Sequence, residues 1–255
     1  ARPLQLTLPL RLLLAIPEDP TGQIDAAAEE ARILAALAPL HPDGVMWETL
    51  TGRFNALDLR QRLERGGFDV LHLISHGTAA GVLLWENDEA VIAPSAALRA
   101  ALEAAPRVRL AVLNACETAV GAGAAPVTSV GAHLLQAGLP AVVAMQFPIA
   151  DQAAAAFAEH FYIELLTGRC PGAVDVAVTL ARSALYTRSP DELAYATPVL
   201  WLNAPDGQIF MPDRRVRLHQ RPTAPPDLAP LRADRVGLET WLATVPPVDA
   251  AHVPT

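Results

Sequence analysis

The chain has 255 residues, enough for one large α/β domain or two small ones. Hydrophobic residues make up 52% of the chain and charged residues 18%, a composition that excludes an intrinsically disordered protein. The formal net charge is −8 and the basic residues do not cluster, so we expect no direct nucleic-acid partner. No apolar run approaches the roughly 18 residues of a transmembrane helix, so we expect no membrane partner.

Cysteine usage and the N-terminal segment bear on the cellular compartment. Cys116 and Cys170 are too few for the disulfide framework of a small secreted protein. The apolar stretch 4–16 is short, contains Arg11 and lacks the small-residue cleavage site of a signal peptide. We therefore expect a reducing, cytoplasmic location.

Predicted strands and helices alternate along most of the chain. The apolar patterns predict, in order, a strand at 11–16, a helix at 25–40, a strand at 45–50, a helix at 57–65 ended by Gly66-Gly67, and a strand at 68–75. A hairpin at 82–85 and 90–92 follows, around Asn87-Asp88, and then a helix at 95–105 with Ser95 as its candidate N-cap. The remaining elements are a strand at 110–113, a helix at 127–137, a strand at 141–145, helices at 151–166 and 174–185, and strands at 199–203 and 208–211. This alternation predicts an α/β fold with a mostly parallel sheet and helices on both faces.

The composition changes after Met211, where prolines punctuate a polar segment. We expect residues 1–211 to form the folded domain. Residues 212–255 are predicted to be an extended, Pro-rich tail or linker, with one short helix near 232–243.

Two short motifs each follow a predicted buried strand. The sequence VLHLISHG occupies 70–77, and LNACET occupies 113–118. Because the carboxyl ends of parallel strands meet at one edge of a sheet, His76 and Cys116 are a candidate base and nucleophile. The backbone N–H groups of Gly77 and Cys116 are candidate donors for an oxyanion hole.

Each motif also has a structural interpretation. A single cysteine at a strand end is usually a small buried hydrophobe, and a single His-Gly is usually a turn. His72 lies inside the apolar run and is expected to be a hydrogen-bonded core histidine. A metal site of His72, His76 and Cys116 has weak spacing and no fourth ligand in the sequence.

Taken together, these two motifs resemble the signature motifs of CHAT domains, cysteine peptidases of the caspase and separase clan. The resemblance continues through SVGAHLLQAGLPAVVA at 129–144, MQFPIAD at 145–151 and PVLWL at 198–202, and covers about residues 11–211. It implies a caspase-haemoglobinase-like three-layer sandwich and endopeptidase activity. His76 would be the general base and acid, Cys116 the nucleophile, and Gly77 and Cys116 the oxyanion donors. Ser75 stands where the family often has glycine, and 145–147 where a Trp-containing stretch is common, which bears on substrate preference.

Two acidic residues are candidates for substrate binding. Asp151 resembles the acidic pocket residue of relatives that cut after basic residues, where a carboxylate would favour Arg or Lys before the scissile bond. Its alternative role is an N-cap of the helix that follows. Glu117, next to the proposed nucleophile, is expected to orient the site or contact substrate, or else to be solvated.

The leading functional hypothesis is therefore a cysteine endopeptidase of restricted specificity that cleaves a protein partner. By family resemblance, we expect it to be controlled by a regulatory or sensor domain in a bacterial signalling or defence system. No cofactor is implied. The alternative is a non-catalytic caspase-like interaction scaffold. A small-molecule hydrolase or transferase that uses Cys116 ranks last, because the sequence has no Gly-x-Ser-x-Gly elbow and no phosphate loop.

Overall fold

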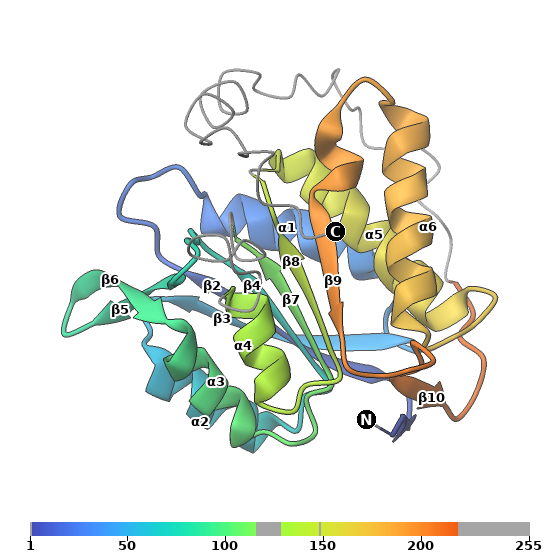
Figure 1. Cartoon of the computed structure of the whole chain (residues 1–255), viewed down its shortest axis with the longest axis horizontal. Coiled ribbons are helices and arrows are strands. Elements are labelled where there is room, and N and C mark those ends of the chain that lie inside the picture. The colour runs from blue at the N-terminus through green and yellow to red at the C-terminus, as the bar shows by residue number, and fades with distance from the viewer. Residues whose placement is uncertain (1, 116–128, 148, 219–255) are drawn as a thin grey trace, which may run out of the picture.

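A six-stranded sheet forms the centre of the molecule (Figure 1). The computed structural model describes residues 2–115, 129–147 and 149–218. In spatial order the strands are β3 (Val45–Gly52), β2 (Leu10–Pro17), β4 (Val70–Ile74), β7 (Leu110–Asn114), β8 (Ala141–Met145) and β9 (Pro198–Leu202). The first five run parallel, and β9 pairs antiparallel with β8.

Three helices cover one face of the sheet: α1 (Ala26–Leu37), α5 (Asp151–Thr167) and α6 (Val174–Arg188). Leu12, Leu14 and Ile16 of β2 point into this core, whereas Leu13 and Ala15 point into the core on the other face. Successive side chains of a strand alternate between faces, so a strand buried on both sides must be apolar throughout. This is why the strand runs could be recognised in the sequence.

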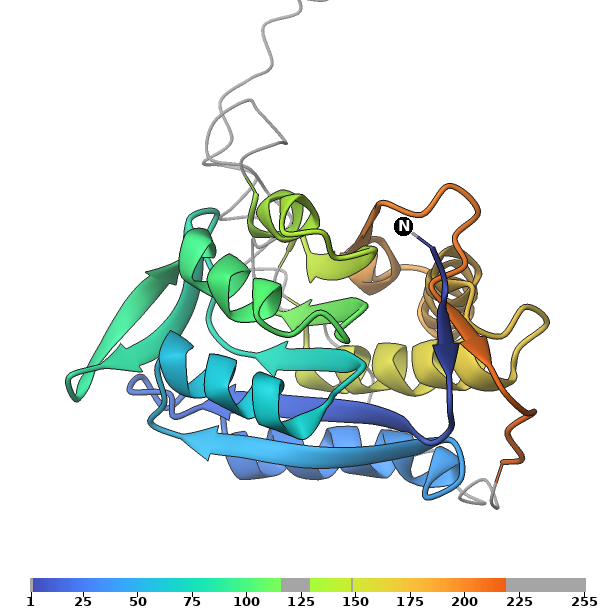
Figure 2. The same cartoon turned by 90° about the horizontal axis from the view of Figure 1, so that it is seen from below.

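The opposite face is covered by α2 (Ala56–Gly66), α3 (Ser95–Glu103) and α4 (Val130–Gln136), so the sheet lies between two helical layers (Figure 2). The start of α2 is fixed by a capping box, in which the Asn55 and Asp58 side chains accept each other's backbone N–H groups. The left-handed φ of +60° at Gly67 ends the same helix, as predicted. The three-layer, mostly parallel α/β architecture is confirmed.

The predicted hairpin is present as β5 (Gly81–Glu86) and β6 (Glu89–Pro94). Asn87 and Asp88 both have positive φ, 51° and 63°, which is the geometry of a tight type I′ turn. Gly81 allows the two strands to close together, because a Cβ there would lie 2.0 Å from the Ala93 carbonyl oxygen. The hairpin projects from the side of the molecule (Figure 1).

Four expectations need correction or extension. The strand predicted at 208–211 does not close the central sheet, because β10 (Phe210–Pro212) pairs in parallel with β1 (Leu4–Leu6), a strand that the sequence patterns did not predict. Ser95 is not an N-cap, since Pro94 occupies that position and the Ser95 hydroxyl hydrogen-bonds to the His133 ring. Short 3₁₀ helices occur at Ala38–Leu40 and Leu193–Ala196.

The chain after residue 211 continues along the domain as far as it is described. The Asp213 N–H donates to the Leu6 carbonyl at 2.9 Å, and Val216 is a buried member of the same core as α1 and α5, next to Gly44. The short helix expected near 232–243 lies outside the described residues. In the part of the chain that the structure describes, no helix has the length and apolarity needed to cross a membrane.

Candidate functional site

The carboxyl ends of β4 and β7 lie side by side. Ile74 of β4 is in register with Asn114 of β7, and the Ser75 N–H donates to the Asn114 carbonyl at 3.2 Å. The buried Ser75 hydroxyl donates to the Leu83 carbonyl of β5 at 2.8 Å, which ties this strand end to the hairpin. The next residue, His76, therefore leaves the sheet from a fixed backbone.

The His76 ring is partly exposed, with 28% of its side chain accessible, and it contacts the loop between β2 and α1. Its Nε2 lies 3.0 Å from Asp19 Oδ2 and 3.3 Å from Thr21 Oγ1. Burial opposes ionisation of Asp19. The N–H groups of Ile24 and Thr21, with His76 and the Thr21 hydroxyl, outweigh that burial and hold the pKa of this carboxyl well below its ordinary value. An ionised carboxylate thus faces one nitrogen of the His76 ring.

Gly77 pairs antiparallel with Val82 in a way that leaves its N–H directed away from the hairpin. The two hydrogen bonds of this pairing run from Leu83 N–H to the His76 carbonyl (2.8 Å) and from Thr78 N–H to the Gly81 carbonyl (2.9 Å). In an antiparallel pair, the residue between two such bonds turns its own N–H to the opposite side. The pairing with the hairpin thus fixes the orientation of the Gly77 N–H but does not form a hydrogen bond with it.

The second predicted motif is only partly described. Asn114 ends β7, and Ala115 follows it as a buried residue. Cys116 and Glu117, the next two residues in the sequence, lie outside the described residues. The other cysteine, Cys170, is free and exposed.

His72 is a core histidine, as its position in the apolar run predicted. It is 2% exposed, and its Nδ1 lies 3.1 Å from the hydroxyl of Tyr162 on α5. Burial lowers the pKa of His72 to about 4 and raises the pKa of Tyr162, so both groups are neutral at pH 7.

Asp151 is the first residue of α5, with Ala150 in the cap position, so its side chain is not an N-cap. Its carboxylate is 60% exposed and lies 3.4 Å from the guanidinium of Arg32 on α1. Arg32 also pairs with Glu29, which is 3% exposed. Burial, followed by the neighbouring Asp151 carboxylate, raises the pKa of Glu29 to about 7 although Arg32 opposes this. Two carboxylates therefore share one arginine at the start of α5.

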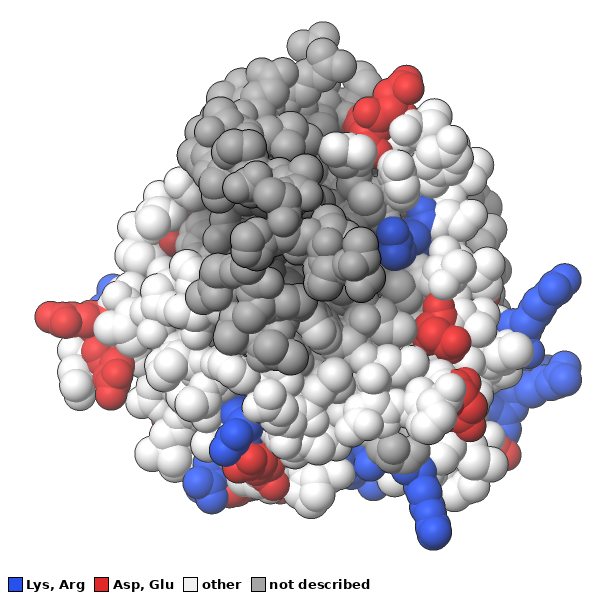
Figure 3. Space-filling model, in the orientation of Figure 1, with Lys and Arg blue, Asp and Glu red and all other residues white. Residues whose placement is uncertain are grey.

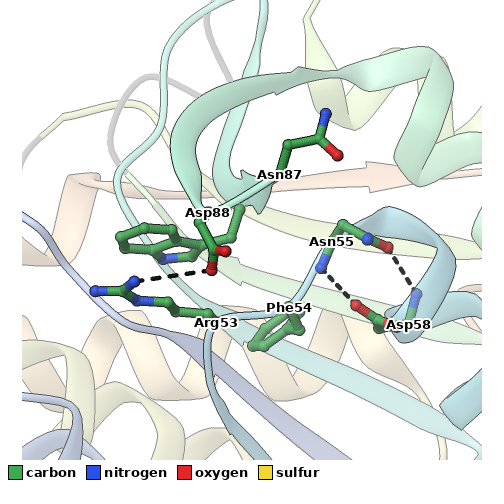
Figure 4. Close-up of a pocket in the computed structure, with 7 residues that line it drawn as sticks. Arg53, Phe54, Asn55, Asp58, Asn87 and Asp88 are labelled. Carbon is green, nitrogen blue, oxygen red and sulfur yellow. Dashed lines mark hydrogen bonds and ion pairs between the residues drawn. The ribbon is translucent and has the colours of Figure 1, made fainter.

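A small cavity of about 180 Å³ lies beside the hairpin turn, and Figure 4 shows its lining. Its polar groups largely satisfy one another. Arg53 lies 3.9 Å from Asp88 and 4.2 Å above the Trp85 ring, and Asn55 and Asp58 form the capping box of α2. We interpret this cavity as part of the support of the hairpin rather than as a ligand site.

Among the described residues, neither the distribution of charge nor a cluster of metal-binding side chains indicates a second candidate site. On the face shown in Figure 3, acidic and arginine side chains are interspersed along the margins of the described surface. Within residues 2–115, 129–147 and 149–218, no cluster of three or more His, Cys, Asp or Glu side chains has the arrangement of a metal site. Within that part of the chain, His72 contacts Tyr162 whereas His76 contacts Asp19.

The sequence patterns did not indicate Asp19 and Thr21 at the site, or Arg32 and Glu29 beside Asp151. Asp19 follows the β2 strand by two residues, as His76 follows β4 by two. This shared position could have indicated that Asp19 lies near His76. That inference requires β2 and β4 to be neighbours in the sheet, which the order of strands along the chain does not reveal.

The sequence matches a known protein family. A model of the CHAT domain family matches residues 2–209. A chain in the crystal structure of the Saccharomyces cerevisiae separase–securin complex is similar over 78% of this chain, with a TM-score of 0.52 and 16% identity. The match covers 12% of that much longer chain, so the likeness concerns the fold of this one domain.

Two further solved structures are similar at lower scores. A secreted C11 cysteine protease from Bacteroides thetaiotaomicron has a TM-score of 0.49 and 12% identity, with 70% of this chain and 59% of that chain covered. Caspase-1 from Spodoptera frugiperda has a TM-score of 0.42 and 12% identity, with 76% and 87% covered. No curated protein matches the sequence significantly. The domain of the separase structure shares the fold of this chain. The family match extends over most of the chain and includes both motifs, so the chain belongs to the CHAT domain family.

Proposed function

We propose that this protein is a cysteine endopeptidase of restricted specificity, with His76 as general base and acid and Cys116 as nucleophile. The observation that carries the proposal is the register of β4 and β7. It sets the strand end that bears His76 beside Asn114, two residues before Cys116 in the sequence. Membership in the CHAT family supports the same reaction class.

In the proposed reaction, His76 accepts the proton of the Cys116 thiol, and the thiolate attacks the carbonyl carbon of the scissile peptide bond. The N–H groups of Gly77 and Cys116 hold the resulting oxyanion. His76 then gives its proton to the leaving amine, which frees the new N-terminus and leaves an acyl-enzyme. A water molecule, deprotonated by His76, hydrolyses the acyl-enzyme and releases the thiol.

The test is covalent labelling of the full chain by a peptidyl acyloxymethyl ketone, read as a mass shift. Probes ending in Arg, Leu or Asp would be compared on wild type, Cys116→Ala and Cys170→Ala. Labelling that is lost only in Cys116→Ala supports the peptidase, because Cys170 is an exposed thiol that controls for non-specific alkylation. If no probe modifies Cys116, even with a partner present, the peptidase proposal fails and the interaction scaffold becomes the better explanation.

We further propose that Asp151 favours a basic residue before the scissile bond and that Arg32 limits this preference. The Arg32 guanidinium already lies 3.4 Å from the Asp151 carboxylate and would compete with a substrate cation. Asp151→Ala should lower the labelling rate with the Arg probe, relative to the Leu probe, by about 10- to 100-fold, the range for a lost charged hydrogen bond. Arg32→Gln should raise the same ratio.

The ratio of the two rate constants is the measurement, because it cancels any common loss of folding. An Arg-to-Leu ratio that neither substitution moves would remove Asp151 from the specificity pocket. Glu117, adjacent to Cys116 in the sequence, would then be the remaining acidic candidate for the specificity pocket.

We also propose that the peptidase acts in a bacterial signalling or defence system under the control of a regulatory or sensor partner. The family resemblance is what supports this assignment.

A further inference from the structure

The loop between β2 and α1 is built around the carboxylate of Asp19. Oδ1 accepts the Thr21 N–H at 2.8 Å, and Oδ2 accepts the N–H groups of Gln23 and Ile24 at 2.7 and 2.8 Å. The Thr21 hydroxyl adds a further bond at 2.8 Å. Only 2% of the Asp19 side chain is accessible to solvent. Backbone donors that converge in this way stabilise a fixed negative charge.

The hairpin anchors this loop from outside. The Trp85 indole N–H donates to the Glu18 carbonyl at 2.8 Å, and the Glu18 N–H donates to the Gly52 carbonyl at 2.9 Å. Arg53 forms two hydrogen bonds to the Glu18 carboxylate, at 3.0 and 3.1 Å, and its guanidinium lies over the Trp85 ring. The residue directly before Asp19 is therefore held by both strands β3 and β5.

From this geometry we propose that Asp19 is a positioning residue for His76. It holds the imidazole as the Nε2–H tautomer, with Nδ1 as the proton-accepting nitrogen. The 3.0 Å contact from Nε2 to an ionised carboxylate fixes which nitrogen carries the proton, because a carboxylate can only accept. The same charge stabilises the imidazolium that forms when His76 takes a proton. The catalytic importance of Asp19 rests on the proposed function, but the tautomer of His76 does not.

Three variants separate charge from folding. Asp19→Asn keeps an oxygen that can face Gln23, Ile24 and His76 but removes the charge, and Asp19→Ala removes both. Asp25→Ala is the matched control, because Asp25 is another loop carboxylate that accepts two backbone N–H groups, as the N-cap of α1, six residues further along the chain. We expect the rate constant for alkylation of Cys116 to fall about 10-fold in Asp19→Asn and about 100-fold in Asp19→Ala, the range for lost orienting partners.

The pH dependence and an NMR measurement distinguish positioning from a merely structural role. In Asp19→Asn, the limb of the pH–rate profile governed by the imidazole should move to lower pH, because the imidazolium loses its neighbouring negative charge. Asp25→Ala should keep the wild-type profile. In parallel, ¹H–¹⁵N spectra of ¹⁵N-histidine-labelled full chain should show His76 as the Nε2–H tautomer in wild type and a mixture in Asp19→Ala.

The two readouts fail in different ways. If Cys116 is not labelled but the tautomer of His76 changes as expected, the peptidase proposal is wrong and the positioning of His76 by Asp19 still holds. A labelled Cys116 with the same pH profile and the same His76 tautomer in all variants would overturn the role of Asp19 alone.

Discussion

His76→Ala is expected to lower the rate of Cys116 alkylation, and of cleavage of a true substrate, by about 10²- to 10⁴-fold, the usual contribution of a positioned general base. His76 has a fixed backbone, with Ser75 bonded to both Asn114 and Leu83, and a ring directed by Asp19. Removing the imidazole leaves the thiol without its proton acceptor. The measurement is the rate constant for alkylation of Cys116, from quenched time courses at several pH values with the most reactive peptidyl acyloxymethyl ketone.

His41→Ala is the matched control for this substitution. His41 is exposed, and its ring lies 4.6 Å from the Trp47 ring at an interplanar angle of 49°. It precedes β3, so it lies near the amino end of that strand. Its replacement should leave the labelling rate within about twofold, as expected for a surface change away from the site. Equal rates for wild type and His76→Ala would exclude His76 as the base, whatever the behaviour of Cys116.

The second large effect concerns stability rather than activity. His72 is buried and neutral, with a pKa of about 4, against 6.5 for an ordinary histidine. The unfolded chain therefore binds a proton to His72 at a higher pH than the folded chain does. Stability contributed by neutral His72 is complete above pH 6.5 and is lost as the pH falls from 6.5 to 4. The shift corresponds to about 3 kcal/mol of unfolding free energy.

Urea unfolding of wild type and His72→Gln across pH 4 to 7.5 measures this contribution. Glutamine cannot titrate, and its side chain can still hydrogen-bond with the Tyr162 hydroxyl. We expect the stability of wild type relative to His72→Gln to fall by about 3 kcal/mol between pH 7 and pH 4. Glu29, whose pKa is raised to about 7, titrates in the opposite sense but is common to both proteins and cancels in the difference. Parallel pH curves for the two proteins would contradict the prediction.

The local elements were predictable because local chemistry determines them. The β2 run is apolar along its length because it is buried on both faces, and Asn87-Asp88 favours a turn with positive φ at both residues. At Ser95, by contrast, a distant residue determines the role of the side chain. Its side chain was expected to cap a helix, but a hydrogen bond to His133, 38 residues away, takes that hydroxyl instead.

The sequence by itself determined the strand–helix alternation, the identity of His76 and Cys116 as the candidate pair, and the interpretation of His72 as a core residue. Only the tertiary structure decided that β2 lies beside β4, which brings Asp19 to His76, and that α1 lies beside α5, which brings Arg32 to Asp151. It also decided that β10 pairs with β1. The residues in these contacts are separated in the sequence by 57, 119 and about 206 positions, respectively. No local periodicity encodes them, because they depend on which faces the strands and helices bury together.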